Sequence, residues 1–218
     1  MADLFLTLGT GLKWLGMLST PLFLLPLAVL ASPRRLAAPA AALSALIDRV
    51  SGAALWAAMG AALIMLFAQA AVVVARYVFG LSFSWLSELV VYGFASLFLL
   101  AAAATLRDDG HVRVDILRPR FGAVGRAGID LAGAYLFIFP VCLLIFWSAI
   151  SPSFVRAWVN FEGSRESDGL PLLFAFRTLV PAFAALLMAQ GLSQALKAAL
   201  VIRGARSEDS LHSQGGGA

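Results

Sequence analysis

The chain carries little charge, few histidines and almost no cysteine. Only 13% of its 218 residues are charged and 61% are hydrophobic, whereas roughly a quarter of a soluble domain is charged. Such a chain lacks the polar groups needed to cover a water-facing surface, so we expect one membrane domain. The single cysteine, Cys142, cannot form a disulfide within the chain and gives no redox information.

Motifs for catalysis are also missing. No HExxH, CxxC, GxSxG or phosphate-binding P-loop occurs, so we expect no catalytic residue, no cofactor and no metal. The one candidate metal cluster, His111 with Asp109 and Asp115, is better explained as a solvated turn. A lipid-embedded enzyme with His111 as base is a remote alternative. The net charge of +4 is typical of membrane proteins and does not indicate a nucleic-acid partner.

Four apolar runs are long enough, or nearly so, to cross a bilayer, which takes roughly 20 helical residues. Nothing in the sequence alternates as a barrel strand would, and helices satisfy their own backbone groups in lipid. The sequence therefore predicts an all-α integral membrane protein with four core transmembrane helices. The runs are Gly52–Ala75, Leu89–Leu106, Leu131–Ile150 and Thr178–Leu196.

The basic residues of the loops predict the orientation. Residues 34–49, 107–126 and 197–206 together hold eleven Lys and Arg, whereas the loops at the other ends of the runs hold four. The positive-inside rule puts the first set, with the C-terminus, in the cytoplasm. We also expect residues 205–218 to form a flexible cytoplasmic tail, because they are polar and Gly-rich.

The leading segment, residues 1–35, is hydrophobic and precedes the membrane domain expected at 36–204. Leu4–Ala31 holds one basic residue and two prolines, and its strong positive charge follows the apolar stretch instead of preceding it. This order disfavours a cleavable signal peptide. It favours a fifth, uncleaved helix with its N-terminus outside, and the alternative is an interfacial or re-entrant segment.

Two shorter segments have helical amphipathic patterns. In Pro39–Val50 one face is apolar and the other polar, and in the loop after the third run three aromatic residues recur at helical spacing. Interfacial helices on the membrane are one interpretation, and packing against other helices of the chain is the other. The apolar face has Leu43, Leu46, Ile47 and Val50, the polar face has Ser44, Asp48 and Arg49, and the aromatic stripe has Phe154, Trp158 and Phe161.

The start of the second run carries candidate contact residues. Glu88 and Tyr92 share a helical face, and Trp85 lies at a depth that aromatic rings prefer. Glu88 has three interpretations: a contact with a partner, a cap on its own helix, or an ion pair with Arg76 that closes the loop between the first two helices.

The same stretch resembles a known family. Arg76-Tyr77 after the first run, Trp85 with Glu88 at the second, and Gly110-His111, Arg113 and Asp115 after it occur in the order found in the small membrane subunit of tripartite ATP-independent periplasmic (TRAP) transporters. The likeness covers about residues 43–202. The stretch FEGSRESDGLPLLFAFRTLVP resembles the mannitol/chloroaromatic-type branch.

The resemblance implies a scaffold subunit without catalysis of its own. Its partners would be a large permease subunit, a periplasmic solute-binding protein and the lipids of a bacterial inner membrane, and the assembly would import organic acids with an ion gradient. The alternative is a homo-oligomeric channel or small carrier lined by Gln69, Gln190 and Ser193. The candidate interface residues are Arg76, Trp85, Glu88, Tyr92, His111, Arg113 and Asp115.

Overall fold

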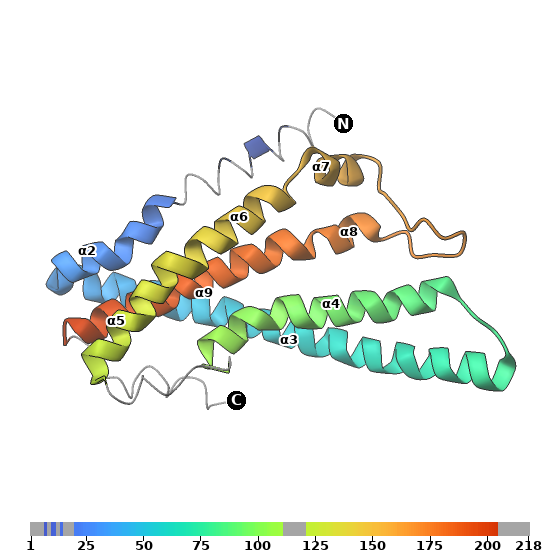
Figure 1. The fold of residues 1–218 in the computed structure, drawn as a ribbon, viewed down its shortest axis with the longest axis horizontal. Coiled ribbons are helices and arrows are strands. Elements are labelled where there is room, and N and C mark those ends of the chain that lie inside the picture. The colour runs from blue at the N-terminus through green and yellow to red at the C-terminus, as the bar shows by residue number, and fades with distance from the viewer. Residues whose placement is uncertain (1–6, 8–9, 12–13, 15–19, 111–120, 205–218) are drawn as a thin grey trace.

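The structure is a computed structural model that describes residues 7, 10, 11, 14, 20–110 and 121–204. Every regular element in this part of the chain is helical, which confirms the predicted all-α class (Figure 1). The elements are η1 (Thr20–Leu24), α2 (Leu25–Ala31), α3 (Pro33–Phe79), α4 (Ser84–Arg107), α5 (Ala123–Gly133), the π-helical η3 (Ala134–Ile138), α6 (Phe139–Ala149), α7 (Pro152–Val159), α8 (Leu173–Arg177) and α9 (Leu179–Ile202).

Four helical stretches of the described residues are long and apolar enough to cross a membrane, and each of them covers one of the predicted runs, except that the third stretch ends one residue before its run does. All are longer than the runs, because polar residues at the ends of a span continue the helix into the interface. The protein is therefore a multi-pass membrane protein. The stretches are Arg35–Phe79, Ser84–Arg107, Ala123–Ala149 and Leu173–Ile202.

The described part of the leading segment includes a short apolar helix, Pro21–Ala31. It is too short to cross a bilayer alone, and it packs on the bundle. Val29 is fully buried, and the ring of Phe23 stacks on Phe139 with centroids 4.5 Å apart. Most of residues 4–19 lie outside the described residues, so a fifth span stays a prediction.

Helix α3 is one unbroken helix of 47 residues, about 70 Å long. The amphipathic segment Pro39–Val50 is its first part, which corrects the expectation of a separate helix lying on the membrane. No proline or turn separates this segment from the first apolar run, so the helix continues. Its packing follows the second interpretation, because Leu43 and Ile47 pack against a core cluster of the chain.

Helices α3 and α4 form a long antiparallel hairpin (Figure 1). Gly80 ends α3 in the left-handed conformation, with φ of 68°, and its N–H bonds to the Ala75 carbonyl, as glycine does at many helix ends. Further along the hairpin, a Cβ on Gly93 would lie 2.8 Å from the Cβ of Met65. The absence of a side chain at Gly93 therefore lets the two backbones approach closely.

Prolines explain the irregularities of the other two spans. Pro140 lacks an N–H and its ring collides with the carbonyl four residues earlier, and the π-helical segment η3 lies at that turn. Pro181 has the same effect on Arg177, where α8 ends before α9 begins. Both helices continue past their prolines, as membrane helices commonly do.

Helix α9 lies at the centre of the bundle. Leu192, Ala195, Leu196 and Ala199 are at most 2% exposed, and this half of α9 packs against α2, α3 and the α5–α6 span. Toward the other end of the molecule the helices diverge (Figure 1). The bundle is therefore tight at one end and splayed at the other.

Candidate functional site

A polar cluster joins α3 to α9 inside the tight end of the bundle. We call it the polar clamp. It consists of Ser44, Asp48 and Ser51 from α3 and Gln190, Ser193 and Lys197 from α9.

The centre of the polar clamp is an ion pair between Asp48 and Lys197. The Lys197 ammonium lies 2.7 Å from Asp48 Oδ2, and the two side chains are 6% and 13% exposed, respectively. The other carboxylate oxygen accepts hydrogen bonds from Gln190 Nε2 at 3.0 Å and from Ser193 Oγ at 2.9 Å. Gln190 accepts in turn from Ser51 Oγ at 2.6 Å.

This geometry makes the polar clamp a structural device. A charge inside a membrane protein is costly unless it is paired and hydrogen-bonded, and both oxygens of the Asp48 carboxylate are occupied by side chains of α9. Three of the roughly four acceptor positions of this carboxylate are thus filled by α9. The arrangement therefore fixes α9 against α3.

Helix α4 is tied in at the same level. Arg107 Nη1 donates to the carbonyl of Asp48 at 3.1 Å, and Gln194 Nε2 donates to the carbonyl of Leu106 at 3.1 Å. The last carbonyls of a helix lack intrahelical partners, so Gln194 satisfies one of them. Three spans are thus joined in one layer.

At the opposite end of α4, Glu88 anchors the loop between α7 and α8. Its carboxylate accepts hydrogen bonds from the Ser164 hydroxyl and from the Leu170 N–H, the latter at 2.7 Å. Among the described residues Arg76 does not pair with Glu88, because its guanidinium instead donates to Ser82 Oγ at 3.4 Å. The predicted Arg76–Glu88 ion pair and the self-capping of Glu88 are both replaced by this long-range contact.

The same loop also caps α4. Asp168 Oδ2 accepts from the N–H of Ser84, the first residue of α4, at 2.9 Å. A carboxylate is favoured at a helix N-terminus, where free N–H groups gather. This bond from the Ser84 backbone lowers the pKa of the Asp168 carboxyl.

Gly169 permits the loop to approach Glu88. A Cβ at Gly169 would lie 2.2 Å from Ser164 Oγ and 2.9 Å from Glu88 Oε1. Both distances are shorter than the contacts that real Cβ atoms make, so a residue with a side chain does not fit here. The Gly-Leu-Pro of this loop is thereby explained by a contact with a residue 81 positions earlier in the chain.

Aromatic contacts hold the remaining predicted residues in place. Tyr92 stacks on Phe176 of α8 with ring centroids 4.3 Å apart. Trp158 donates to Thr178 Oγ1 at 3.2 Å and meets Phe174 edge-on. The aromatic stripe of the loop after the third run thus packs against the chain's own helix α8, which is the second of its two interpretations.

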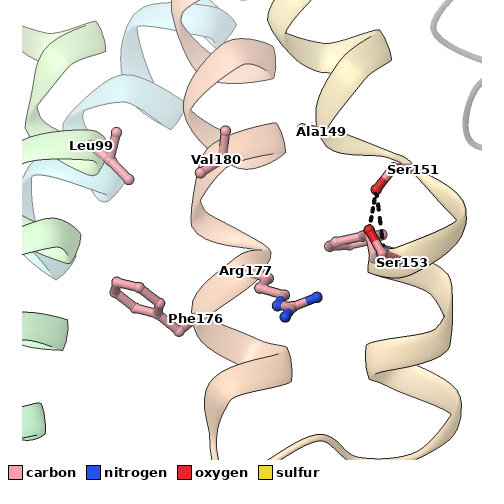
Figure 2. A pocket seen from close by; sticks show the side chains of 8 residues that line it. Leu99, Ala149, Ser151, Ser153, Phe176, Arg177 and Val180 are labelled. Carbon is pink, nitrogen blue, oxygen red and sulfur yellow. Dashed lines mark hydrogen bonds between the residues drawn. The ribbon is translucent and has the colours of Figure 1, made fainter.

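A cleft of about 280 Å³ opens between α4, the α6–α7 corner and the α8–α9 junction (Figure 2). Leu99 and Phe176 lie on one side, Arg177 lies in the middle, and Ser151 and Ser153 lie on the other side. Arg177 is paired with Glu162 at 3.1 Å, and the two hydroxyls bond to each other at 2.8 Å. Each of these polar groups thus has at least one partner within the chain.

The structure divides the predicted interface residues into three groups. Arg76 and Trp85 are exposed. Glu88 and Tyr92 contact other parts of the chain. The predicted cytoplasmic residues His111, Arg113 and Asp115 lie outside the described residues. No group of three potential metal ligands occurs in the described part of the chain.

Sequence reasoning missed the polar clamp, although it left a signal. On α3, Ser44, Asp48 and Ser51 recur at spacings of four and three, which place them on one face. On α9, Gln190, Ser193 and Lys197 do the same. Two polar stripes of this kind in otherwise apolar helices indicate faces that meet.

The ion pair gives a stability prediction. Lys197→Met should lower the free energy of unfolding by about 3 kcal/mol, because Asp48 would stay buried without its counter-charge. Asp48→Asn combined with Lys197→Met should recover much of that loss. Circular dichroism during heating in detergent measures the effect in these two variants and in the Asp48→Asn single variant. Additive losses in the double variant would show that the pair is not coupled.

The loop anchor gives a second prediction. Glu88→Ala should speed tryptic cleavage after the exposed Arg165 about tenfold, because lost hydrogen bonds to a charged group open the loop. Asp168→Asn should act in the same direction at neutral pH. Since folding lowers the pKa of Asp168, its capping is present above the ordinary carboxyl value and is lost as the pH falls through the lowered one. Ser167→Ala, in the same loop, is the control, and equal rates in all variants would contradict the anchor.

Comparison with known families finds a match. Residues 65–200, more than half of the chain, match the model described as "Tripartite ATP-independent periplasmic transporters, DctQ component". Comparisons with curated proteins and with solved structures found no match. The matched region contains α4, the anchored loop and nearly all of α9, including Lys197. The chain therefore belongs to the DctQ component family of tripartite ATP-independent periplasmic transporters.

Proposed function

We propose that this chain is the small scaffold subunit of a TRAP secondary transporter. With a large permease subunit and a periplasmic solute-binding protein, it takes part in the import of organic acids driven by an ion gradient. The observation that carries this proposal is the polar clamp, in which the buried polar groups of α3 and α9 satisfy one another. A subunit that moves solute would need open polar groups along a path. A supporting subunit needs stiffness instead.

The channel or small-carrier alternative fits the structure less well. Two of its three lining residues, Gln190 and Ser193, are fully buried and hydrogen-bonded to Asp48. They could face water only if the contact between α3 and α9 opened. An enzymatic role has no support either, because the family is one of transporter components. We therefore assign no catalytic residue.

The location that we propose is the bacterial inner membrane, with the C-terminus in the cytoplasm. The α3–α4 turn and the loop between α7 and α8 lie at one end, joined through Asp168 and Ser84. Arg107 lies near Asp48 at the other end, and among the described basic residues Arg49 is next to Asp48 and Arg203 directly follows the end of α9. This distribution supports the orientation that the positive-inside rule predicts.

We also propose membership of the mannitol/chloroaromatic-type branch. The supporting stretch is FEGSRESDGLPLLFAFRTLVP, whose Ser164, Gly169 and Leu170 form the contact with Glu88. The cytoplasmic residues His111, Arg113 and Asp115 remain candidates for contacts with the large subunit, together with the exposed Arg76 and Trp85.

Reconstitution tests the function. Vesicles with the large subunit and the binding protein should take up organic acid under an ion gradient only when this chain is present, and this chain alone should give no uptake. Isotope-labelled substrate measures both. Undiminished uptake without the chain would reject the scaffold role, and uptake by the chain alone would favour the carrier.

Charge reversal tests one candidate contact. Arg113→Glu should reduce co-purification of the large subunit several-fold, since like charges in an interface are repulsive. Arg203→Glu, another change among the cytoplasmic basic residues, is the matched control. If Arg113→Glu leaves co-purification unchanged, this residue does not lie in the interface.

A further inference from the structure

Gln69 lies on the surface of α3 at the depth of the hydrocarbon core. Gly52 lies beside Arg107 at one end of α4, and Gln69 lies seventeen residues after Gly52. Helix α3 ends at Phe79, ten residues after Gln69. At 1.5 Å per residue these separations are about 25 Å and 15 Å. Gln69 is therefore well inside a core of about 30 Å.

Its side chain is exposed and makes no hydrogen bond to another described residue. An amide carries two donors and an acceptor, and lipid tails can satisfy none of them. The other amides of the spans differ from it, because Gln190 bonds to Asp48 and Gln194 bonds to the end of α4. An unsatisfied amide at this depth indicates contact with a group from outside the chain.

Gln69 lies on the same face of α3 that α9 covers nearer the start of the helix. Gln69 and Ser51 are eighteen residues apart, which is about five turns of helix, so both lie on the same side. At Ser51 that side is buried against Gln190. At Gln69 it is exposed, in the half of α3 where the helices diverge (Figure 1).

The same face argues against a second copy of this chain. Arg76 lies seven residues beyond Gln69, about two turns on, and is exposed. Two copies that packed through this face about a two-fold axis normal to the membrane would bring Arg76 against Arg76. Like charges held together near lipid are repulsive. The face therefore fits a different chain that carries an acidic group at this level.

We propose that the face formed by Leu66, Gln69, Val73 and Arg76 is the docking surface for a transmembrane helix of the large permease subunit. That helix presents a hydrogen-bonding group to Gln69 and a carboxylate to Arg76. Leu66, which is 60% exposed, and Val73, which is 44% exposed, provide the apolar contact between them. This inference rests on the proposed function, because it takes the large subunit as the partner.

Site-specific crosslinking tests the proposal. A photoreactive p-benzoylphenylalanine replaces Gln69 in the full chain, co-expressed with its cognate large subunit and irradiated in membranes. The control position is Phe67, which is 71% exposed, lies at nearly the same depth and points to almost the opposite side of α3. We expect an adduct with the large subunit from position 69, at least fivefold above that from position 67.

Each other outcome overturns the proposal. Equal adducts from both positions would mean that the contact is not specific to this face. An adduct of two copies of this chain from position 69 would make the face a homo-oligomer contact. No adduct from position 69, while the large subunit still co-purifies, would place the docking surface elsewhere and leave the proposed function intact.

A substitution provides a second measurement. Gln69→Leu should weaken co-purification of the large subunit about threefold, the usual effect of one interhelical hydrogen bond in a membrane. Gln69→Asn, which retains an amide, should recover part of this. The thermal unfolding of the isolated chain should not change in either variant, because Gln69 bonds to no other described residue. A loss of stability in Gln69→Leu would indicate a role within the chain and contradict the proposal.

Discussion

The Asp48–Lys197 ion pair determines how the spans of this protein can be arranged. Two opposite charges that leave water must lie at the same depth, and their remaining hydrogen-bonding positions must be filled. That requirement fixes the position of α9 along α3, and through Gln190 and Ser193 it also fixes its rotation. Apolar packing alone would not do so, because lipid tails are as apolar as the helix surfaces.

The stagger of the helices follows from this fixed point. Since Arg107 binds the carbonyl of Asp48, α4 ends at the level of the ion pair, and the first turns of α3 continue beyond it to pack with α2 and α9. At the other end no comparable polar contact joins α3 to α9 within the described residues, and the helices spread. There the loop between α7 and α8 is bonded to α4 through Glu88 and Asp168, and this contact connects α4 to the α7–α8 region. A bundle held rigid at one end and braced at the other suits a supporting subunit.

The four spans were predictable because a bilayer demands about 20 apolar residues whatever the neighbours are. The continuation of α3 through Pro39–Val50 was not, because composition does not say where a helix leaves the lipid. The direction of its polar face was also misleading. In a soluble or interfacial helix polar residues face water, but in a membrane bundle they face inward, as Ser44 and Asp48 do. The partners of Glu88 lie about 80 residues away in the sequence, beyond the reach of any local pattern.

Gln69 and Gln190 show why the sequence alone could not separate structure from contact surface. Both are glutamines within apolar runs, and from the sequence both were candidates to line the same path. What separates them is the crossing of α9 over α3. At the crossing, the Gln190 amide of α9 is buried against Ser51 of α3. Gln69 lies about five turns beyond Ser51 on the same face of α3, where α9 no longer covers it, and is exposed. In water an exposed glutamine carries no information, because the solvent satisfies it. In lipid it has no such partner, so its exposure points beyond the chain, to a protein that completes the bundle.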